Sequence, residues 1–247
     1  MFTRLLQSRH VLCKYSKHRY FSGLINESNS ILRKLVAINH TDRDEKWLET
    51  FFDIVGSANL IVSKEVTYGP DGFHYIDMRI PDIDEDLQDV DAGSLDFLKD
   101  QIIKNDGYGV VIKSSDDKVN WVFSYGDIVN LYMNNTFKPK DRPAGVKDGK
   151  DQFKEGEELR VSNPPEEYLP VPVRTALRQF FGRYKIKTPR CALIKRTLKS
   201  GEEVQELAFV GSNIPQEVAE RVVWFLPRHY LIVIIAATDC PFPSTPL

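Results

Sequence analysis

Apolar and polar residues follow two different rhythms along this chain of 247 residues. In some stretches apolar residues recur every three or four positions, which predicts amphipathic helices. In others they alternate with polar residues, which predicts strands. In the first half the predicted helices begin near Ser28, Asp42, Ser94 and Asp127, of which Asp42 and Ser94 suit helix capping. The predicted strands cover residues 59–66, 73–80, 108–113 and 118–123.

Two of these strands alternate strictly, so each is expected to bury one face. The apolar positions are Ile76, Met78 and Ile80 in one strand and Val119, Trp121 and Phe123 in the other. The turn residues of 68–72, with two glycines and a proline, predict a hairpin between the first two strands. Trp47, Trp121 and Trp224 occupy apolar-periodic positions and are expected in the core.

The second half predicts a different order of elements. Residues 134–154 are almost wholly polar and rich in proline and glycine, which indicates a linker. The elements predicted after it are strand 157–161, helix 171–181, strands 191–198 and 204–210, helix 215–226 and strand 230–236. This strand-helix-strand-strand-helix-strand order is ferredoxin-like. We therefore predict an α+β fold of two small mixed domains, residues 24–133 and 155–247, joined by linker 134–154.

Part of the second half resembles a known family. Residues 157–211 begin with a strand, and a proline-rich lead-in from Asn163-Pro164-Pro165 to Pro170 then enters a helix. This stretch, with the hairpin and second helix after it, resembles the carboxy-terminal domain of the SseB (serine-sensitivity enhancer) family. The resemblance implies an α/β module with no established active site. That family is largely bacterial.

The first 23 residues have the composition of a targeting segment. They carry five positive charges and several hydroxyl residues, and the first acidic residue is Glu27. This composition is typical of a mitochondrial transit peptide. Arg19, Phe21 and Ser22 resemble the site cut by the matrix processing peptidase, which predicts cleavage after Phe21. The alternatives are a disordered basic arm and a misassigned start codon in a bacterial gene.

Charge and cysteine content exclude several classes of protein. The formal net charge is −2, and because residues 1–23 contribute five positive charges, the remainder carries −7. An acidic body is poorly suited to a phosphate backbone, so we expect no nucleic-acid partner. Three widely spaced cysteines predict reduced thiols rather than a disulfide framework. No apolar run reaches the roughly 20 residues that span a bilayer, so no membrane span is expected.

The sequence contains few signs of site chemistry. No zinc-ligand spacing, phosphate-binding loop or nucleophile motif occurs, so we expect no metal, cofactor or catalytic residue. The acidic segment Asp82–Asp91 matches the first ligands of an EF-hand loop at Asp82, Asp84 and Asp86, but Leu87 replaces the required glycine. A solvated acidic loop and cation binding by another geometry remain the two interpretations.

These observations favour a non-enzymatic protein-interaction or assembly protein of the mitochondrial matrix, acting as an accessory subunit of a complex. Tyr125, Tyr132 and Tyr168 are expected to be partly exposed, where they would anchor a protein partner. One alternative is a bacterial cytosolic SseB-like protein with a disordered or misassigned N-terminus. Another is an enzyme of unrecognised type. The pattern does not specify an oligomeric state.

Overall fold

The computed structural model describes residues 27–87, 90–141, 159–197, 201, 203–240 and 242–247. The chain divides into two compact units, the first made of residues 1–103 and 108–138 and the second of residues 104–107 and 139–247. Each unit contains a mixed sheet with helices, which confirms the predicted α+β fold of two small domains. The predicted transit peptide, its cleavage residues Arg19, Phe21 and Ser22, and residues 142–154 of the predicted linker lie outside the described residues.

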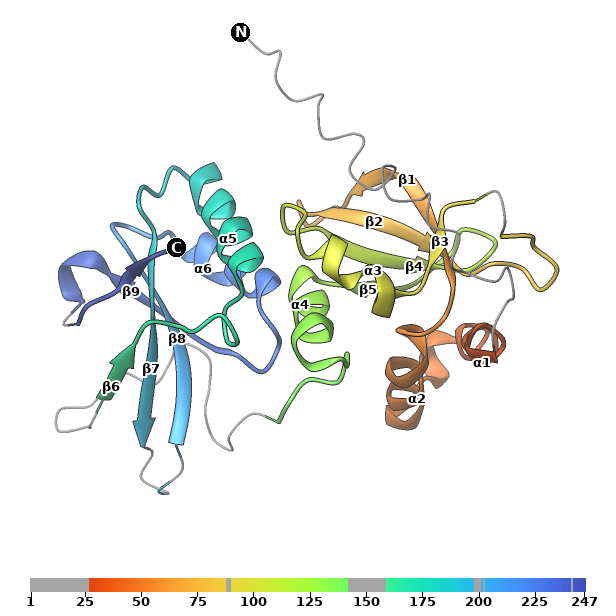
Figure 1. The fold of residues 1–247 in the computed structure, drawn as a ribbon, viewed down its shortest axis with the longest axis horizontal. Helices are drawn as coiled ribbons and strands as arrows, with labels where there is room; N and C mark the ends of the chain where they lie inside the picture. The colour runs from red at the N-terminus through yellow and green to blue at the C-terminus, as the bar shows by residue number, and fades with distance from the viewer. Residues whose placement is uncertain (1–26, 88–89, 142–158, 198–200, 202, 241) are drawn as a thin grey trace, which may run out of the picture. The chain divides into compact units, whose positions relative to one another are not determined.

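Unit 1 contains a five-stranded sheet and four α-helices within the described residues (Figure 1). Its helices are α1 (Glu27–Val36), η1 (His40–Asp42), α2 (Glu45–Val55), α3 (Leu95–Ile102) and α4 (Tyr125–Asn134). Its strands are β1 (Leu60–Tyr68), β2 (His74–Arg79), β3 (Ala92–Gly93), β4 (Gly109–Lys113) and β5 (Val119–Phe123). The strand order is β3-β1-β2-β4-β5, in which only β2 and β4 are parallel.

Side-chain caps explain where three of these helices begin. The start predicted at Ser94 is confirmed, since its hydroxyl caps α3. The cap of α2 is Asp44, which accepts a hydrogen bond from the backbone N–H of Trp47 at 2.7 Å. The prediction of Asp42 was wrong because Asp42 instead ends the short 3-10 turn η1. A capping box between Ser124 and Asp127 starts α4 two residues earlier than predicted.

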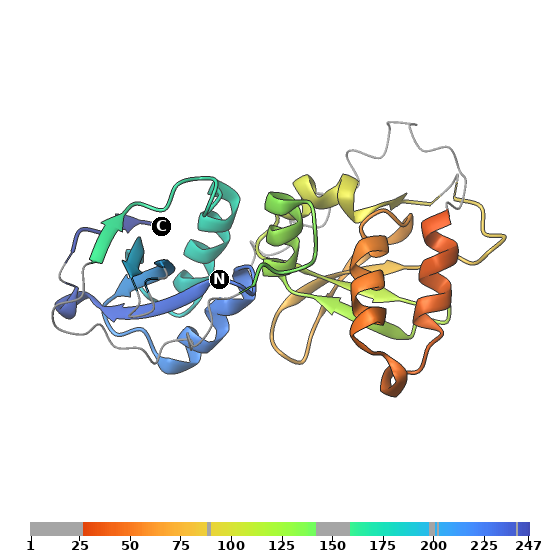
Figure 2. The ribbon, with the colours of Figure 1, turned by 90° about the horizontal axis from the view of Figure 1, so that it is seen from below.

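The core of unit 1 lies against one face of its sheet. Ile76, Met78 and Ile80 are at most 1% exposed, which confirms the predicted alternation in β2. All four α-helices contribute to this core, through Leu32, Phe51, Leu95 and Ile128 among others. Figure 2 shows α1 and α2 lying side by side over the sheet. The helices of unit 1 therefore pack on the face that Ile76 shares, and none of those described packs on the opposite face.

One strand of unit 1 departs from its predicted alternation. Trp121 and Phe123 pack in the core, but Val119 is 47% exposed. Ile112 pairs with Trp121, whereas Lys113 pairs with Val119, so Asn120 is an extra residue in β5. A bulge of this kind shifts the register by one residue and turns the next side chain to the other face.

Unit 2 contains a second mixed sheet. Its described helices are α5 (Val171–Arg183), α6 (Gln216–Arg221), η2 (Val222–Phe225) and η3 (Ala237–Asp239). Its strands are β6 (Leu159–Ser162), β7 (Arg190–Thr197), β8 (Glu203–Gly211), β9 (Leu231–Ala236) and β10 (Thr245–Pro246). The strand order is β10-β7-β8-β9, and β6 pairs with the same edge of β7 as β10.

The predicted order of elements in this unit is confirmed from β6 to β9. The strands also lie side by side in chain order, so α6 connects two neighbouring parallel strands, β8 and β9. Helix α5 packs through Phe181 on Phe209 of β8, with ring centroids 5.5 Å apart. Ala192, Ile194 and Ala208 form a second buried cluster on the other face of the sheet.

Candidate functional site

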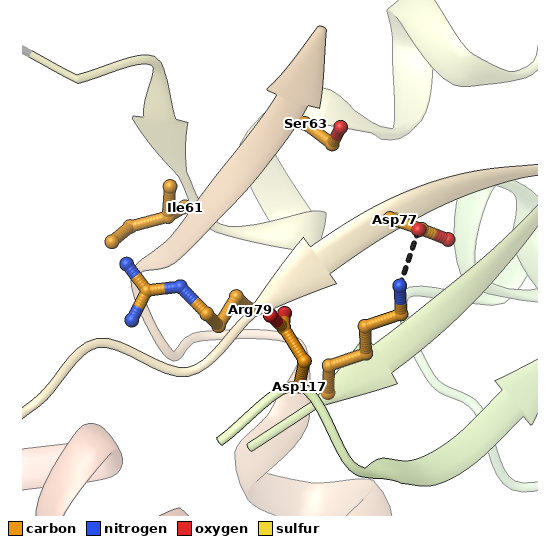
Figure 3. Close-up of a pocket in the computed structure, with 6 residues that line it drawn as sticks. Ile61, Ser63, Asp77, Arg79 and Asp117 are labelled. Atoms are coloured by element: carbon orange, nitrogen blue, oxygen red, sulfur yellow. Dashed lines mark hydrogen bonds and ion pairs between the residues drawn. The ribbon is translucent and has the colours of Figure 1, made fainter. Parts of the chain in front are cut away.

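The helix-free face of the sheet in unit 1 contains a hollow of about 230 Å³. It is lined by Ile61 and Ser63 of β1, Asp77 and Arg79 of β2, Lys113 of β4, and Asp117 of the β4–β5 turn. Figure 3 shows the lining side chains around the hollow, with a dashed line at Asp77 that marks its ion pair with Lys113, and with Arg79 extending toward Ile61. Four of the six are charged, which makes this the strongest candidate site in the described residues.

The register of the sheet brings these side chains together. Arg79 is the pairing partner of Ile61 in β1 and of Lys113 in β4, so the three residues form one row across the sheet. Asp77 is two residues before Arg79 and therefore faces the same side. Two cations in neighbouring strands repel each other unless carboxylates compensate them. Arg79 and Lys113 are each paired with a carboxylate, Arg79 with Glu85 and Lys113 with Asp77.

Lys113 is compensated by Asp77. The ammonium lies 2.5 Å from Asp77 Oδ2, and the two side chains are 23% and 14% exposed. Thr67 Oγ1 donates a second hydrogen bond to the same oxygen at 2.8 Å. The other oxygen, Asp77 Oδ1, is buried and has no hydrogen-bond partner among the described residues. The carboxylate therefore retains unused acceptor capacity beside the hollow.

Arg79 is compensated by Glu85 in the loop that follows β2. Arg79 Nη1 donates to Glu85 Oε2 at 2.9 Å, and the backbone N–H of Asp82 donates to the same oxygen at 3.0 Å. The hydrogen bond from Arg79 lowers the pKa of Glu85 below its ordinary value. The hydrogen bond to Glu85 raises the pKa of Arg79 in turn, with smaller contributions from the charges of Asp82 and Asp117. The guanidinium is therefore held as a fixed cation.

Asp117 completes the hollow from an unusual backbone conformation. Its φ angle is 62°, in the left-handed region that Asp and Asn tolerate better than other residues with side chains. Its backbone N–H donates to the carbonyl of Ser114 at 3.0 Å, which closes the turn between β4 and β5. An exposed carboxylate is thereby placed at the rim of the hollow.

The lining is made of charged side chains, one hydroxyl and one aliphatic residue. It contains no histidine or cysteine, and its one hydroxyl, Ser63 Oγ, accepts from the backbone N–H of Glu65 at 3.1 Å. Within the described residues no group of three His, Cys, Asp or Glu side chains is placed to hold a metal ion. The hollow presents two compensated cations, the paired carboxylate of Asp77 and the exposed carboxylate of Asp117.

None of the other residues that the sequence singled out as candidates lines the hollow. In the acidic segment Asp82–Asp91, Asp82, Asp84 and Asp86 are exposed and Glu85 binds Arg79, while residues 88–89 lie outside the described part. Cys191 is buried, and its burial raises the pKa of its thiol.

No helix among the described residues combines the length and apolar character needed to cross a membrane.

The predicted tyrosine anchors have three different environments. Tyr125 was expected to be partly exposed, and this was wrong: it is completely buried, and its hydroxyl donates to the carbonyl of Ile103. It is the first residue of α4, directly after the cap Ser124, and faces inward. Tyr168 is half-buried and stacks on Tyr230 with ring centroids 4.3 Å apart. Tyr132 is 36% exposed and is the most accessible of the three.

Sequence reasoning did not identify the residues of the hollow. Asp77 and Arg79 occupy the polar side of an alternating strand, where charges usually do no more than face water. The one usable signal was the Lys at the end of β4, because opposite charges in diagonal positions on the same face of two neighbouring strands can form a cross-strand pair. That signal requires the pairing of β2 with β4, which the pattern alone does not give.

Comparisons with known proteins add no relative. No family model, curated protein or solved structure matches the chain. The resemblance to the SseB family therefore stays a prediction from residues 157–211.

Proposed function

We propose that this chain is a non-enzymatic protein-interaction or assembly protein whose partner-binding surface is the helix-free sheet face around the Asp77–Lys113 hollow. The observation that carries the proposal is the set of three charged side chains on this face, Asp77, Arg79 and Lys113, which are partly buried and already in ion pairs. Side chains that are ordered before binding lose little further conformational entropy when a partner arrives. A face with this property is suited to recognition.

The charges also indicate the chemistry of the partner surface. Arg79 and Lys113 form one cationic row, while Asp77 and Asp117 supply carboxylates beside it. A partner that presents a carboxylate to the row and an N–H donor or cation to the carboxylates would match both signs. Charge arrangements of this kind contribute mainly to specificity and orientation. The partner is therefore a protein surface with alternating charge rather than a purely apolar one.

The location in the mitochondrial matrix is part of the proposal and depends on residues 1–23. Their basic, acid-free composition and the residues Arg19, Phe21 and Ser22 support import followed by cleavage. The intact mass of the protein purified from its native source tests this. A chain that starts at Ser22 is the expected result. A chain that retains Met1 would contradict the matrix location and favour the bacterial alternative.

The interaction itself is tested by native co-purification with two matched double variants. Asp77→Asn/Lys113→Met removes the ion pair of the hollow as a unit, so no buried charge is left without its partner. Asp53→Asn/Lys138→Met removes an exposed Asp–Lys pair of the same unit, in which Lys138 Nζ lies 2.8 Å from Asp53 Oδ1. Both variants are first compared with the wild type by circular dichroism to show that they fold.

We expect the wild type and the Asp53/Lys138 variant to co-elute with the same protein, and the Asp77/Lys113 variant to lose it. If both variants retain that protein, the hollow is not the binding surface. If the wild-type chain elutes alone from native extracts, the proposed assembly role is wrong.

A further inference from the structure

The two sheets expose four edges, and three of them are protected against pairing with another chain. In unit 1, the edge strand β3 has only two residues and pairs with Leu60 and Ile61, and the rest of β1 on that side carries the charged residues Lys64 and Glu65. In unit 2, the edge beside β7 is formed by β6, which has four residues including Arg160, and by β10, which has two residues including Pro246. Short edge strands, charged edge residues and proline are common ways in which proteins avoid edge-to-edge association. The remaining two edges, β5 and β9, differ sharply from each other.

The edge of β5 is blocked by Arg43 and by the bulge at Asn120. Arg43 Nη1 donates to the backbone carbonyl of Asn120 at 3.1 Å, and Nη2 donates to its side-chain oxygen at 3.2 Å. The guanidinium thus uses a backbone carbonyl that would otherwise accept a hydrogen bond from an added strand. A bulge and a charged side chain at the edge are both recognised protective devices.

The edge of β9 has no such protection. The strand spans six residues, Leu231–Ala236, with the sequence LIVIIA, and pairs with β8 on one side. No strand among the described residues pairs with its other side. It contains no proline, no glycine and no charge, and Ile232, Val233 and Ile234 are partly exposed. An apolar, β-branched edge of this kind is a template for strand pairing.

We infer that β9 pairs with β9 of a second copy of this chain, antiparallel, across a two-fold axis at Val233. This register sets Leu231 against Ile235, Ile232 against Ile234, and Val233 against itself. Residues set opposite each other have the same parity and so lie on the same face of the joined sheet. Every opposed pair is aliphatic, so the edge is complementary to itself.

A second copy fits this edge better than a foreign strand. Two-fold pairing uses the same surface on both chains and closes both edges at once, which gives a dimer and not an open chain. The edge carries no charge that would select a different sequence. A single strand pair buries less surface than a permanent dimer needs, so the dimer dissociates on dilution.

The test is sedimentation velocity of the full chain over a range of concentrations, with two lysine variants. Ile234→Lys places a charge on the β9 edge, and Val171→Lys places one at an aliphatic residue of the same unit that is already 52% exposed. We expect the wild type and Val171→Lys to shift from monomer to dimer as concentration rises. Ile234→Lys is expected to need a concentration at least tenfold higher than the wild type before it forms a dimer.

Hydrogen exchange of the wild type provides a second measurement that needs no variant. Outward-facing amides of β9 are expected to exchange more slowly in the dimer than after dilution to the monomer. A wild type that is monomeric at all concentrations overturns the inference. Dimerisation of Ile234→Lys equal to that of the wild type, or a dimer whose β9 amides exchange as in the monomer, overturns it as well. None of these outcomes concerns the hollow of unit 1, so this inference and the proposed function fail separately.

Discussion

Arg196 of β7 donates through Nη2 to Glu206 Oε1 of β8 at 2.8 Å, and the two side chains are only 4% and 5% exposed. The ion pair is thus enclosed in unit 2. A charge that is removed from water costs free energy that its partner must return. Replacing one member of the pair is therefore expected to lower the free energy of unfolding much more than replacing both.

Replacement of one member is expected to destabilise the chain strongly. Arg196→Met removes the guanidinium from the buried carboxylate of Glu206, and breaking a buried pair in this way typically costs about 3–5 kcal/mol. The double variant Arg196→Met/Glu206→Leu replaces the pair by apolar groups and should cost much less. Urea denaturation followed by circular dichroism measures both free energies of unfolding.

The control is the exposed pair formed by Arg160 and Glu203, whose atoms lie 3.7 Å apart. Glu203→Gln should change the free energy of unfolding by less than about 1 kcal/mol, because solvent screens this pair. Equal effects of Arg196→Met and Glu203→Gln would show that burial of the first pair is energetically unimportant.

Arg43 is expected to stabilise unit 1 through its geometry as well as its charge. Besides Asn120 it donates to the carbonyls of Val36 and Ile38, and its guanidinium carbon lies 4.4 Å from the ring centroid of Trp47. Arg43→Ala should cost about 1.5–3 kcal/mol, since several acceptors lose a charged donor. Arg43→Lys should recover little of this, because an ammonium cannot reach carbonyls on three sides and stack on an aromatic ring.

Thermal and urea unfolding of both Arg43 variants give the comparison. Lys46→Ala is the control, since this exposed lysine lies close to Arg43 in the chain and shares none of its contacts. If Arg43→Lys is as stable as the wild type, charge alone explains the contribution of Arg43.

The helices and strands were predictable because each depends on neighbours in the sequence. The alternation of Ile76, Met78 and Ile80 needs only the two-residue period of a strand, and the structure buries all three. Local signals failed where two equivalent choices lay close together. Asp42 and Asp44 are both good caps, and only the turn η1 decides between them.

The candidate site was not predictable because it depends on pairing between distant segments. Asp77 and Lys113 meet only because β2 pairs with β4 in a parallel register, with β3 and α3 between them in the chain. The bulge at Asn120 is similar, since nothing within β5 marks the extra residue. Side-chain periodicity indicates which face a residue takes, but not which strand lies beside it.

The Arg79–Glu85 pair is expected to make stability depend on pH on the acidic side. The pKa of Glu85 is lowered in the folded chain, so the pair stabilises above the ordinary pKa of Glu, and this stabilisation is lost as the pH falls through the lowered value. Glu85→Gln should therefore be less stable than the wild type at pH 7, and the difference should shrink as the carboxyl becomes protonated in strong acid.

Urea denaturation at several pH values from neutral to strongly acidic measures this difference. Asp84→Asn provides the control, because this exposed neighbour has no ion pair among the described residues. A stability gap between wild type and Glu85→Gln that stays constant down to the most acidic pH would mean that the ion pair is not its cause.

At the C-terminal end of α5, the glycine lies inside the helix, whereas a lysine occupies the left-handed position just after it. Lys185, just after the helix, has φ of 59°, a left-handed conformation that glycine commonly adopts at this point. Its N–H donates to the carbonyl of Gly182 at 3.0 Å, and the N–H of Ile186 donates to that of Phe181 at 3.1 Å. At Gly182, inside the helix, no atom other than those of its chain neighbours and of the helix backbone lies within 4 Å of where a Cβ would lie.

Two substitutions at this helix end are therefore expected to stabilise the chain. Gly182→Ala should gain about 0.5–1 kcal/mol, because glycine is a poor helix former and the added methyl meets open space. Lys185→Gly should gain up to about 1 kcal/mol, because it relieves the left-handed strain of a residue with a Cβ. Lys187→Gly, two residues later at a position without positive φ, should instead destabilise, since it only adds freedom to the unfolded chain. Urea denaturation ranks the three variants, and a loss of stability in Lys185→Gly as large as in Lys187→Gly would show that the turn after α5 is unstrained.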